Sequence, residues 1–525
     1  MSQQRQHVQP LWQQAELHAS RKEWAEATAC FNSLLASSPE DPKILVQLSY
    51  IHSLAGHYRA AQDHALRASR AKPSDPAVVR ELVARLRTFN AAQALNDCVE
   101  RLRPLERMPI PLLLACAAQY SYLNEQERAL QLLDEAKRGD PAYPATLLAR
   151  GQVLTYLGRF DEAEADIQSC LRRAPELAQG WWLLARLRKQ RPDNNHVEDI
   201  RMQLQRPGRR PAEIALLANA LHKELDDLGQ HAEAWVALEQ ACRAKRATLD
   251  YRSEDSRALV SSLIQLPVPR VCPPPPVRHP RTPIFIVGMH RSGTTLLEQL
   301  LDGHPDIRGV GELYDFTSQM RHATDYHCRG VIDSGLVERS ATVDFAAVGA
   351  GYLKGMEWRL GAEQFFTDKL PSNFLNIGFI CQALPQAKIL HMTRDPMETC
   401  FSNLREFFSD ACAYSYDQRE LADYFGQYRR LMVHWHRAYP DRIMDVDYAE
   451  LTRDPETVLR GVAAFCGFQF EPDMLDLRRR ERGVATASAV QVRDSIQARV
   501  EPKWAPYARN LEPLRLALEA DTRKA

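Results

Sequence analysis

The chain has 525 residues, 45% of them hydrophobic and 26% charged, which is typical of a globular protein with more than one domain. Lysine plus arginine and aspartate plus glutamate number 67 each, so no net basic field favours nucleic acid as a partner. The polar start MSQQRQHVQP predicts no secretory signal, and no apolar run reaches the roughly 18 residues of a transmembrane helix. The eleven cysteines form no CxxC pair, which favours a reduced, cytoplasmic protein without structural zinc.

The first half of the chain repeats a pattern with a period of about 34 residues. Most units open on an aromatic residue, have a small residue three positions later and close on a proline. This order of residues is expected if each unit forms two packed helices that cross at the small residue. The openings are Trp24, Tyr58, Ala92, Gln126 and Phe160; Ala27, Ala61, Leu95, Ala129 and Ala163 follow; Pro39, Pro73, Pro141 and Pro175 close, with Arg107 and nearby Pro109 in the third unit.

This pattern resembles the tetratricopeptide repeat, and five units in register predict an all-α solenoid over residues 1–264. The register slips past Gly180, but helical pairs are expected to continue from Glu213 to Arg246. Such arrays expose a concave surface that binds peptides or proteins. The resemblance therefore implies recruitment of a protein or peptide partner, and the alternative is that the array only packs on the second half.

Four consecutive prolines lie between Gln265 and Arg281 and predict a stiff connector over residues 265–281. Beyond it, over residues 282–525, short apolar runs alternate with helical segments. This alternation predicts an α/β domain with a mainly parallel sheet, whose ligands gather at the carboxyl ends of the strands. The expected strands are IFIV, FFTD, KILHMT and RIMDVD at residues 284–287, 365–368, 388–393 and 442–447.

The first of these strands leads into a glycine-containing turn and then an amphipathic helix. Backbone N–H groups at a helix N-terminus surround anions well, and Arg291 adds a fixed positive charge. Gly288 and Gly293 have the spacing of a P-loop, but Thr294 stands where a nucleoside-triphosphate enzyme has lysine. The turn therefore predicts a phosphate-like ligand, with an unusual kinase as an alternative. Its hydroxyl donors are Ser292, Thr294 and Thr295.

A second segment, from Thr367 to Asn403, contains TDKLPSNF and RDPMETCFS. Together with PIFIVGMHRSGTT, these motifs resemble the 3′-phosphoadenosine-5′-phosphosulfate (PAPS) sulfotransferases, in particular the tyrosylprotein sulfotransferase-like branch, over roughly residues 282–507. The resemblance implies PAPS as sulfuryl donor, PAP as product, no metal, and a tyrosine of a protein or peptide as the leading acceptor. Alternatives are a carbohydrate, lipid or small-molecule hydroxyl, and a repeat scaffold that binds nucleotide without catalysis. Related enzymes can be dimeric, so a homodimer is also expected.

The resemblance assigns donor-binding residues one by one. It departs from the tyrosyl branch at Glu406, where that branch has an arginine, and at Asp494 and Ser495, which replace Lys-Pro. The loop Arg291, Ser292, Gly293, Thr294 and Thr295 matches the 5′-phosphosulfate motif, Arg394 and Ser402 match the 3′-phosphate motif, and Tyr448, Ser488, Gln491 and Lys503 match further donor contacts.

Two residues match the family's catalytic groups. Glu312, in DIRGVGEL, matches the general base, which removes the proton of a phenol whose ordinary pKa is about 10. Lys369 matches the group that stabilises the bridging oxygen of the leaving product. The structural alternatives are a solvated loop carboxylate and an ion pair with Asp368 or another acid. Weaker base candidates are Asp315 and His322, and the pair His434 and His436 is predicted to be structural.

Overall fold

The computed structural model describes residues 2–268, 281–477 and 501–522. Ser488 and Gln491 therefore lie outside the described residues, as does most of the predicted proline-rich connector. The chain forms two compact units, one of residues 1–141 with 314–358, the other of residues 142–313 with 359–525. Each unit combines helices from the repetitive half with a segment of the second half. The domain limits inferred from the sequence stay a prediction.

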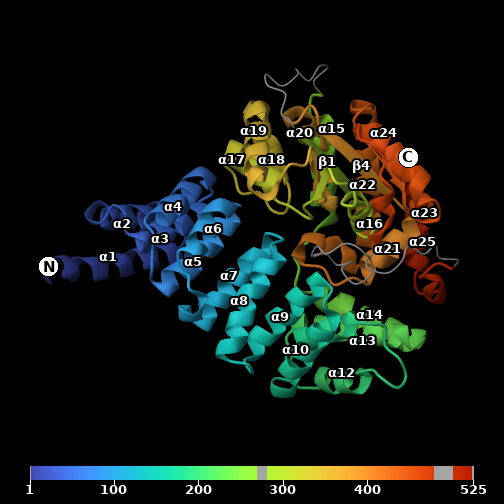
Figure 1. The fold of residues 1–525 in the computed structure, drawn as a ribbon, viewed down its shortest axis with the longest axis horizontal. Coiled ribbons are helices and arrows are strands. Elements are labelled where there is room, and N and C mark those ends of the chain that lie inside the picture. Colours follow the sequence, from blue (N-terminus) through green and yellow to red (C-terminus); the bar gives the residue numbers. More distant parts are fainter. Residues whose placement is uncertain (1, 269–280, 478–500, 523–525) are drawn as a thin grey trace. The chain divides into compact units, whose positions relative to one another are not determined.

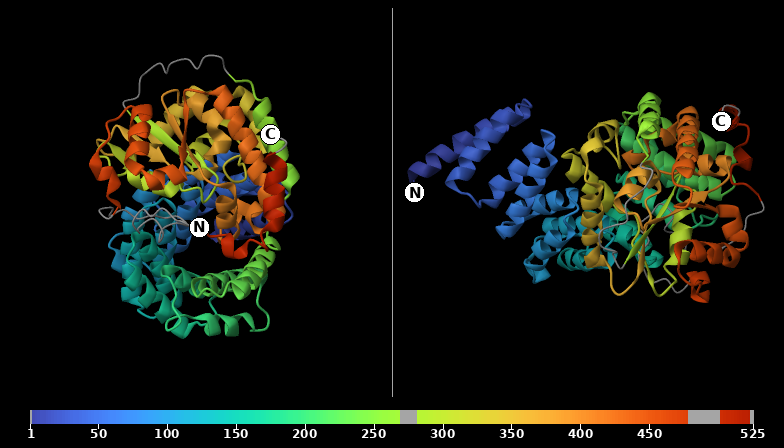
Figure 2. Two further views of the ribbon diagram at one scale, coloured as in Figure 1. Left: turned by 90° about the vertical axis from the view of Figure 1, so that its right-hand side faces the viewer. Right: turned by 90° about the horizontal axis from the view of Figure 1, so that it is seen from above.

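The repetitive half is entirely helical, and its helices follow one another in packed pairs (Figure 2). The second helix of each pair begins at the opening residue of a sequence unit, and the residue three positions later is fully buried in each. The sequence period thus fixes where these helices begin and pack. The first unit contains α1 (Ser2–Ser20), α2 (Trp24–Ser37), α3 (Pro42–Leu54), α4 (Tyr58–Arg70), α5 (Pro76–Thr88), α6 (Ala92–Glu100), α7 (Ile110–Tyr122) and α8 (Gln126–Gly139).

The helices continue into the second unit, where the last of them pack beside the sheet domain's own segments. The predicted helical stretch from Glu213 to Arg246 forms two of them, α13 and α14. None of the described helices has the length and apolar character that a bilayer span requires. The set is α9 (Pro144–Leu157), α10 (Phe160–Arg173), α11 (Ala178–Leu187), α12 (Val197–Leu204), α13 (Pro211–Asp227), α14 (His231–Arg246) and α15 (Ser253–Gln265).

The first unit also holds three helices from the second half of the chain, α17 (Asp315–Thr324), α18 (Ser334–Arg339) and α19 (Phe345–Met356). The hydroxyls of Tyr58 and Ser318 lie 3.0 Å apart in a buried contact between α4 and α17. Ser318 also donates to the backbone oxygen of Phe89 at 3.0 Å. Here, part of the repetitive half packs on the second half of the same chain.

The second unit is built on a five-stranded, wholly parallel sheet of order β2-β3-β1-β4-β5. The strands β1 and β4 are labelled in Figure 1. All four predicted strands are present, and the three-residue β2 is the one that the sequence analysis missed. So short a run carries too little apolar pattern to be recognised. The strands are β1 (Thr282–Gly288), β2 (Ile307–Gly309), β3 (Phe365–Asp368), β4 (Lys388–Thr393) and β5 (Ile443–Asp447).

Helices cover both faces of the sheet. On one face, α16 (Thr294–Leu301) and α24 (Pro455–Cys466) bury leucine and valine side chains against Ile284 and Ile286 of β1. On the other, α22 (Gln418–Ala438) brings Tyr428 onto His391 of β4. The remaining helices of this region are α20 (Ile377–Ala383), α21 (Pro396–Leu404), α23 (Tyr448–Arg453) and α25 (Glu512–Thr522). The carboxyl ends of β1, β3 and β4 are thereby held at one edge.

One buried histidine makes the stability of the second unit depend on pH. His222 of α13 is buried, and its Nδ1 lies 2.9 Å from the backbone oxygen of Ala234. Burial, with a smaller effect of Arg405, lowers the pKa of His222 to about 4 from the ordinary 6.5. Between these two values the unfolded chain binds the proton and the folded chain does not, so the free energy of unfolding falls as the pH falls.

We expect the free energy of unfolding to decrease by about 2 kcal/mol on this account between pH 7 and pH 5. The variant His222→Asn keeps a side-chain N–H for Ala234 but does not titrate. Urea unfolding of the wild type and this variant at both pH values measures the difference. An equal pH dependence in the two proteins would contradict the assignment.

Candidate functional site

The turn between β1 and α16 has a backbone that few residues can adopt. Arg291 and Gly293 have φ angles of +67° and +110°, in the left-handed region. A Cβ atom on Gly293 would lie 2.4 Å from the ring of Tyr448. Glycine is therefore required at position 293 both by its conformation and by the close approach of the tyrosine.

The same turn encloses a hydroxyl that has no protein partner. Ser292 is buried, and its Oγ makes no hydrogen bond within the described part of the chain. A Cβ on Gly288 would lie 3.0 Å from this oxygen and 2.7 Å from the backbone oxygen of Met392. Because a buried hydroxyl without a partner costs free energy, an acceptor atom of a bound ligand is the natural partner of Ser292.

Residues of the second motif meet this turn, although they lie about a hundred positions later. Arg291 Nε donates to the Oγ of Ser402 at 3.2 Å. Arg394 Nη1 donates to the backbone oxygen of Arg291 at 3.2 Å, and its guanidinium lies 4.5 Å from the centre of the Tyr448 ring. The structure thus brings Arg291, Ser402, Arg394 and Tyr448 together, while their role in binding a donor stays a prediction.

A carboxylate that the sequence analysis did not select connects Arg394 with the segment that contains Lys503. Glu398 of α21 pairs with Arg394 at 2.6 Å. Its other oxygen accepts the backbone N–H of Lys503 at 2.8 Å. The predicted Lys503 is therefore held beside Arg394 by its main chain. The spacing of Arg394 and Glu398, four residues apart at a helix start, was a readable signal for this ion pair.

The two predicted catalytic residues contact each other directly. Lys369 Nζ lies 2.6 Å from Glu312 Oε1, with Lys369 fully buried and about a third of the Glu312 side chain exposed. The Lys369 backbone N–H also donates to the oxygen of Gly311 at 3.1 Å. The ion pair considered as a structural alternative for Lys369 thus exists with Glu312. Both residues lie at the carboxyl edge of the sheet, after β2 and β3.

His290 is a polar residue of this site that the sequence analysis did not select. Its Nδ1 lies 3.0 Å from the hydroxyl of Tyr414 and its Nε2 lies 3.4 Å from that of Ser372. Burial lowers the pKa of His290 to about 4, with Glu312 opposing and Lys369 reinforcing the shift. The imidazole of His290 is therefore neutral beside the Glu312–Lys369 pair. Its position directly before Arg291 was the available signal.

The weaker base candidates come from one helix of the second half of the chain. Asp315 and His322 both lie on α17 in the first unit. His322 Nδ1 is 2.7 Å from the side-chain oxygen of Gln62, so this histidine contacts a helix of the repetitive half.

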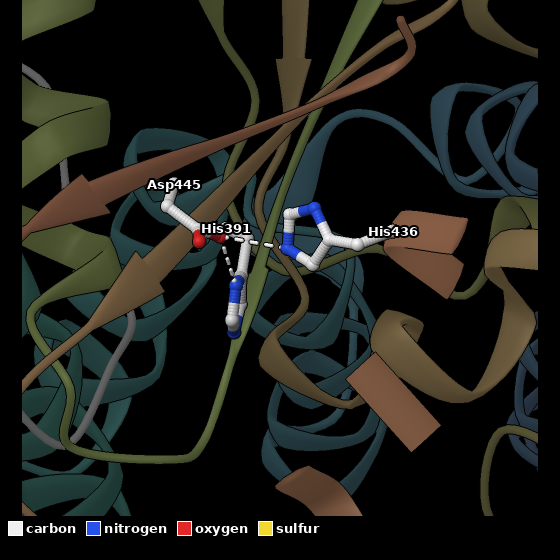
Figure 3. Close-up of side chains that lie close together, drawn as sticks. All are labelled: His391, His436 and Asp445. Atoms are coloured by element: carbon white, nitrogen blue, oxygen red, sulfur yellow. Dashed lines mark hydrogen bonds and ion pairs between the residues drawn. The ribbon is translucent and has the colours of Figure 1, made fainter. Parts of the chain in front are cut away.

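His436, one of the two histidines expected to be structural, belongs to a hydrogen-bonded set (Figure 3). Asp445 Oδ1 lies 2.6 Å from His391 Nδ1 and 2.9 Å from His436 Nε2. These three ligand-type atoms all lie within 4.8 Å of one another, close enough for a metal ion. The hydroxyl of Tyr428 contacts the other nitrogen of His391. Hydrogen bonds therefore already account for both nitrogens of the buried His391.

Residues 283–472 match the model of the Sulfotransferase family. The matched segment makes up about a third of the chain. It contains nearly all of β1, the whole of β2 to β5, the turn between β1 and α16, and the Glu312–Lys369 pair.

Several proteins are similar to this chain over different lengths. The chain is 28% identical over 404 residues to an uncharacterized protein of Aquifex aeolicus, an alignment that covers 74% of this chain and 52% of that protein. It is 26% identical over 231 residues to a putative protein-tyrosine sulfotransferase of Caenorhabditis briggsae, covering 42% of this chain and 80% of the relative. The sulfotransferase domain from the curacin biosynthetic pathway aligns with 16% identity and a TM-score of 0.32, over 47% of this chain and 98% of the domain. The chain thus spans about half the length of the Aquifex relative.

The close approach of Gly293 to Tyr448 yields a stability test. We expect Gly293→Ala to lower the free energy of unfolding by about 1–3 kcal/mol, because the methyl group meets the ring in a strained backbone. The matched control is Gly461→Ala in α24, where a Cβ meets only Met444 at an ordinary 3.5 Å. The control should be about 0.5–1 kcal/mol more stable, through helix propensity. Urea unfolding measures both; equal effects would contradict the packing described.

Proposed function

We propose that this protein transfers a sulfuryl group from PAPS to an acceptor hydroxyl. The observation that carries the proposal is the convergence of two anion-binding elements within a sulfotransferase-family domain. The turn with Ser292 and Arg291 suits the 5′-phosphosulfate, and Arg394 with Ser402 suits a 3′-phosphate, which ATP lacks. The absence of a P-loop lysine at Thr294 further disfavours a triphosphate.

The residues present fit the donor. The partnerless Oγ of Ser292 supplies a buried hydrogen-bond donor, and the start of α16 directs backbone N–H groups to the same place. Two guanidinium groups lie beside it, and guanidinium binds phosphate through two parallel hydrogen bonds. Tyr448, against which Arg394 stacks, offers an aromatic face near the adenosine end of this cluster.

The catalytic pair suits an in-line transfer. Glu312 takes the proton of the acceptor hydroxyl while that oxygen forms its bond to sulfur. Lys369 stabilises the charge that develops on the bridging oxygen as its bond to sulfur breaks. Arg291 and the backbone N–H groups of the turn offset the remaining negative charge. In this mechanism a carboxylate is the base, and fixed cationic side chains take the place of a metal ion.

For the acceptor we favour a tyrosine in a protein or peptide. The motif resemblance and the likeness to a putative protein-tyrosine sulfotransferase support this choice. We also propose that the paired helices are tetratricopeptide repeats that help to recruit the acceptor, supported by their 34-residue spacing. A carbohydrate, lipid or small phenolic hydroxyl is the second candidate, because the donor residues would be the same.

Nucleotide selectivity tests the donor. Isothermal titration calorimetry of the full chain should detect PAP binding and no ATP binding under the same conditions. The reason is that Arg394 and Ser402 are proposed to recognise a 3′-phosphate, which ATP lacks. Arg394→Gln should weaken PAP binding by about tenfold or more. A protein that binds ATP and ignores PAP would be a kinase-like enzyme, and the proposal would be wrong.

Transfer of ³⁵S from labelled PAPS to a tyrosine peptide or a cell lysate tests catalysis. Glu312→Gln and Lys369→Ala should each reduce the rate by about a hundredfold or more, since each removes a group acting in the transition state. Addition of a chelator should leave the rate unchanged.

The nucleotide-binding scaffold is distinguished in the same assay. Retained PAP binding with no transfer to any acceptor would favour the scaffold over the enzyme. Tandem mass spectrometry of the labelled product then identifies the acceptor group, and sulfate on a sugar or lipid would replace tyrosine by the second candidate.

A further inference from the structure

A buried carboxylate lies directly behind the anion-binding turn. Glu406 follows α21, and only 7% of its side chain is exposed. Its Oε2 lies 3.6 Å from Arg291 Nη1, and its Oε1 accepts from Arg186 Nη1. Burial by itself raises the pKa of Glu406, but Arg186 and Arg291 overcome that effect and lower it. Glu406 is therefore a negatively charged group next to Arg291, which is proposed to bind the donor.

Arg186 comes from the repetitive half of the chain, near the end of α11. Its guanidinium lies 4.7 Å from the ring centre of Trp182, one turn earlier on the helix. The ring of Trp182 in turn contacts that of Phe407, the residue after Glu406, at 5.8 Å. Cation–π stacking and the ion pair thus fix the same guanidinium from two sides.

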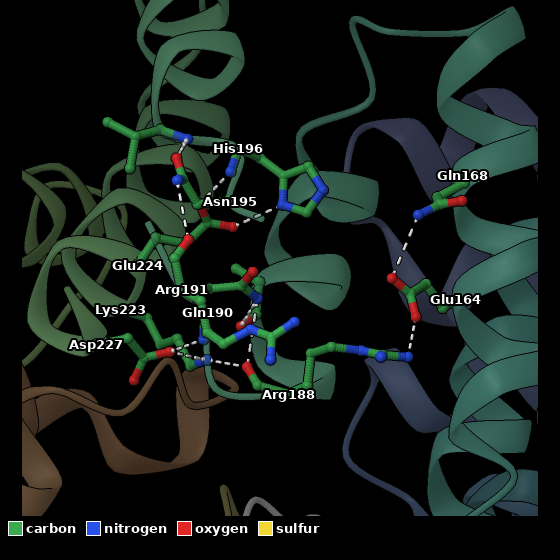
Figure 4. Close-up of polar contacts among 12 residues, drawn as sticks. Glu164, Gln168, Arg188, Gln190, Arg191, Asn195, His196, Lys223, Glu224 and Asp227 are labelled. Carbon is green, nitrogen blue, oxygen red and sulfur yellow. Dashed lines mark hydrogen bonds and ion pairs between the residues drawn. The ribbon is translucent and has the colours of Figure 1, made fainter. Parts of the chain in front are cut away.

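Polar contacts hold the chain that follows α11 against α13 (Figure 4). Asp227 of α13 accepts the backbone N–H of Gln190 at 2.8 Å and pairs with Lys223 at 2.6 Å. Lys223 also donates to the backbone oxygen of Arg188. Two polar contacts from one helix therefore hold the segment just beyond Arg186.

The segment that contains Glu406 is held by hydrogen bonds and an ion pair from α13 and α11. Arg405 pairs with Asp226 of α13 at 2.8 Å. Asn219 donates to the backbone oxygen of Arg405 at 3.1 Å and accepts from Trp182 Nε1 at 3.1 Å. Arg186 and Glu406 are thus held at a set separation by α11 and α13.

From this geometry we infer that Arg186 is a positioning residue of the donor site. It neutralises Glu406 and thereby leaves Arg291 to bind the anionic donor. Without Arg186, Glu406 pairs with Arg291 alone. Its negative charge then competes with the phosphosulfate for Arg291 and repels it. The inference rests on the proposed function, and it adds that a helix of the repetitive half is required for donor binding.

A double-mutant cycle with PAP as the probe tests this role. Calorimetry on full-length protein should give about tenfold weaker PAP binding for Arg186→Gln, and near wild-type binding for Arg186→Lys, which keeps the charge. In Glu406→Gln, PAP binding should be as tight as in the wild type or tighter. The double variant Arg186→Gln with Glu406→Gln should return to within about twofold of Glu406→Gln alone. The matched control is Arg188→Gln, whose side chain pairs with Glu164 of α10, and it should bind PAP normally.

The outcomes separate this inference from the proposed function. Wild-type protein that binds no PAP contradicts the proposed function itself. Normal PAP binding by Arg186→Gln, or a loss that persists in the double variant, overturns the positioning role. Thermal unfolding followed by circular dichroism accompanies each titration. If Arg186→Gln is unfolded, Glu406→Gln alone decides: weakened PAP binding in that variant would refute the inference.

Discussion

The neutralisation of one buried carboxylate is the constraint on which the architecture of the candidate site depends. Glu406 cannot remain charged in its buried position without cations, and two arginines from distant parts of the chain meet it. One of them belongs to the turn between β1 and α16 and the other to α11. This arrangement makes the last helices of the repetitive half structural parts of the domain that follows them.

The same pairing recurs at the other cations of the site. Lys369 pairs with Glu312 and Arg394 with Glu398, at 2.6 Å in each case. The positive groups are therefore held in place before any ligand arrives, which lowers the entropy cost of ordering them on binding. Under the proposed function, the anionic donor would have to exchange partners with these carboxylates. Selectivity among anions would then depend on how well each ligand replaces the carboxylates, more than on its total charge.

Much of this fold could be predicted from the sequence, because its signals are local. The apolar runs of β1, β3, β4 and β5 and the 34-residue register of the helices each depend on neighbouring residues. The meeting of Arg291 with Ser402 and Arg394 was also foreseeable, since parallel strands place their carboxyl ends at one edge.

The groups that the sequence analysis missed depend on packing between distant segments. Arg186 and Glu406 are 220 residues apart, and no period or motif connects them. Glu406 was noticed only as a departure from the arginine expected there. His290 has an ordinary position in the sequence, and only its burial between Tyr414 and Ser372 gives it a neutral ring.

The way α11 and α13 hold the Arg405–Phe407 segment has an evolutionary consequence. Repeat arrays commonly gain and lose units by duplication and deletion, because each unit contacts only its neighbours. Here an inserted or lost helix between α11 and α13 would separate Arg186 from Asp226, and both contacts with Glu406 and Arg405 could not survive together. Variation in the number of units among descendants of this chain should therefore not fall between α11 and α13.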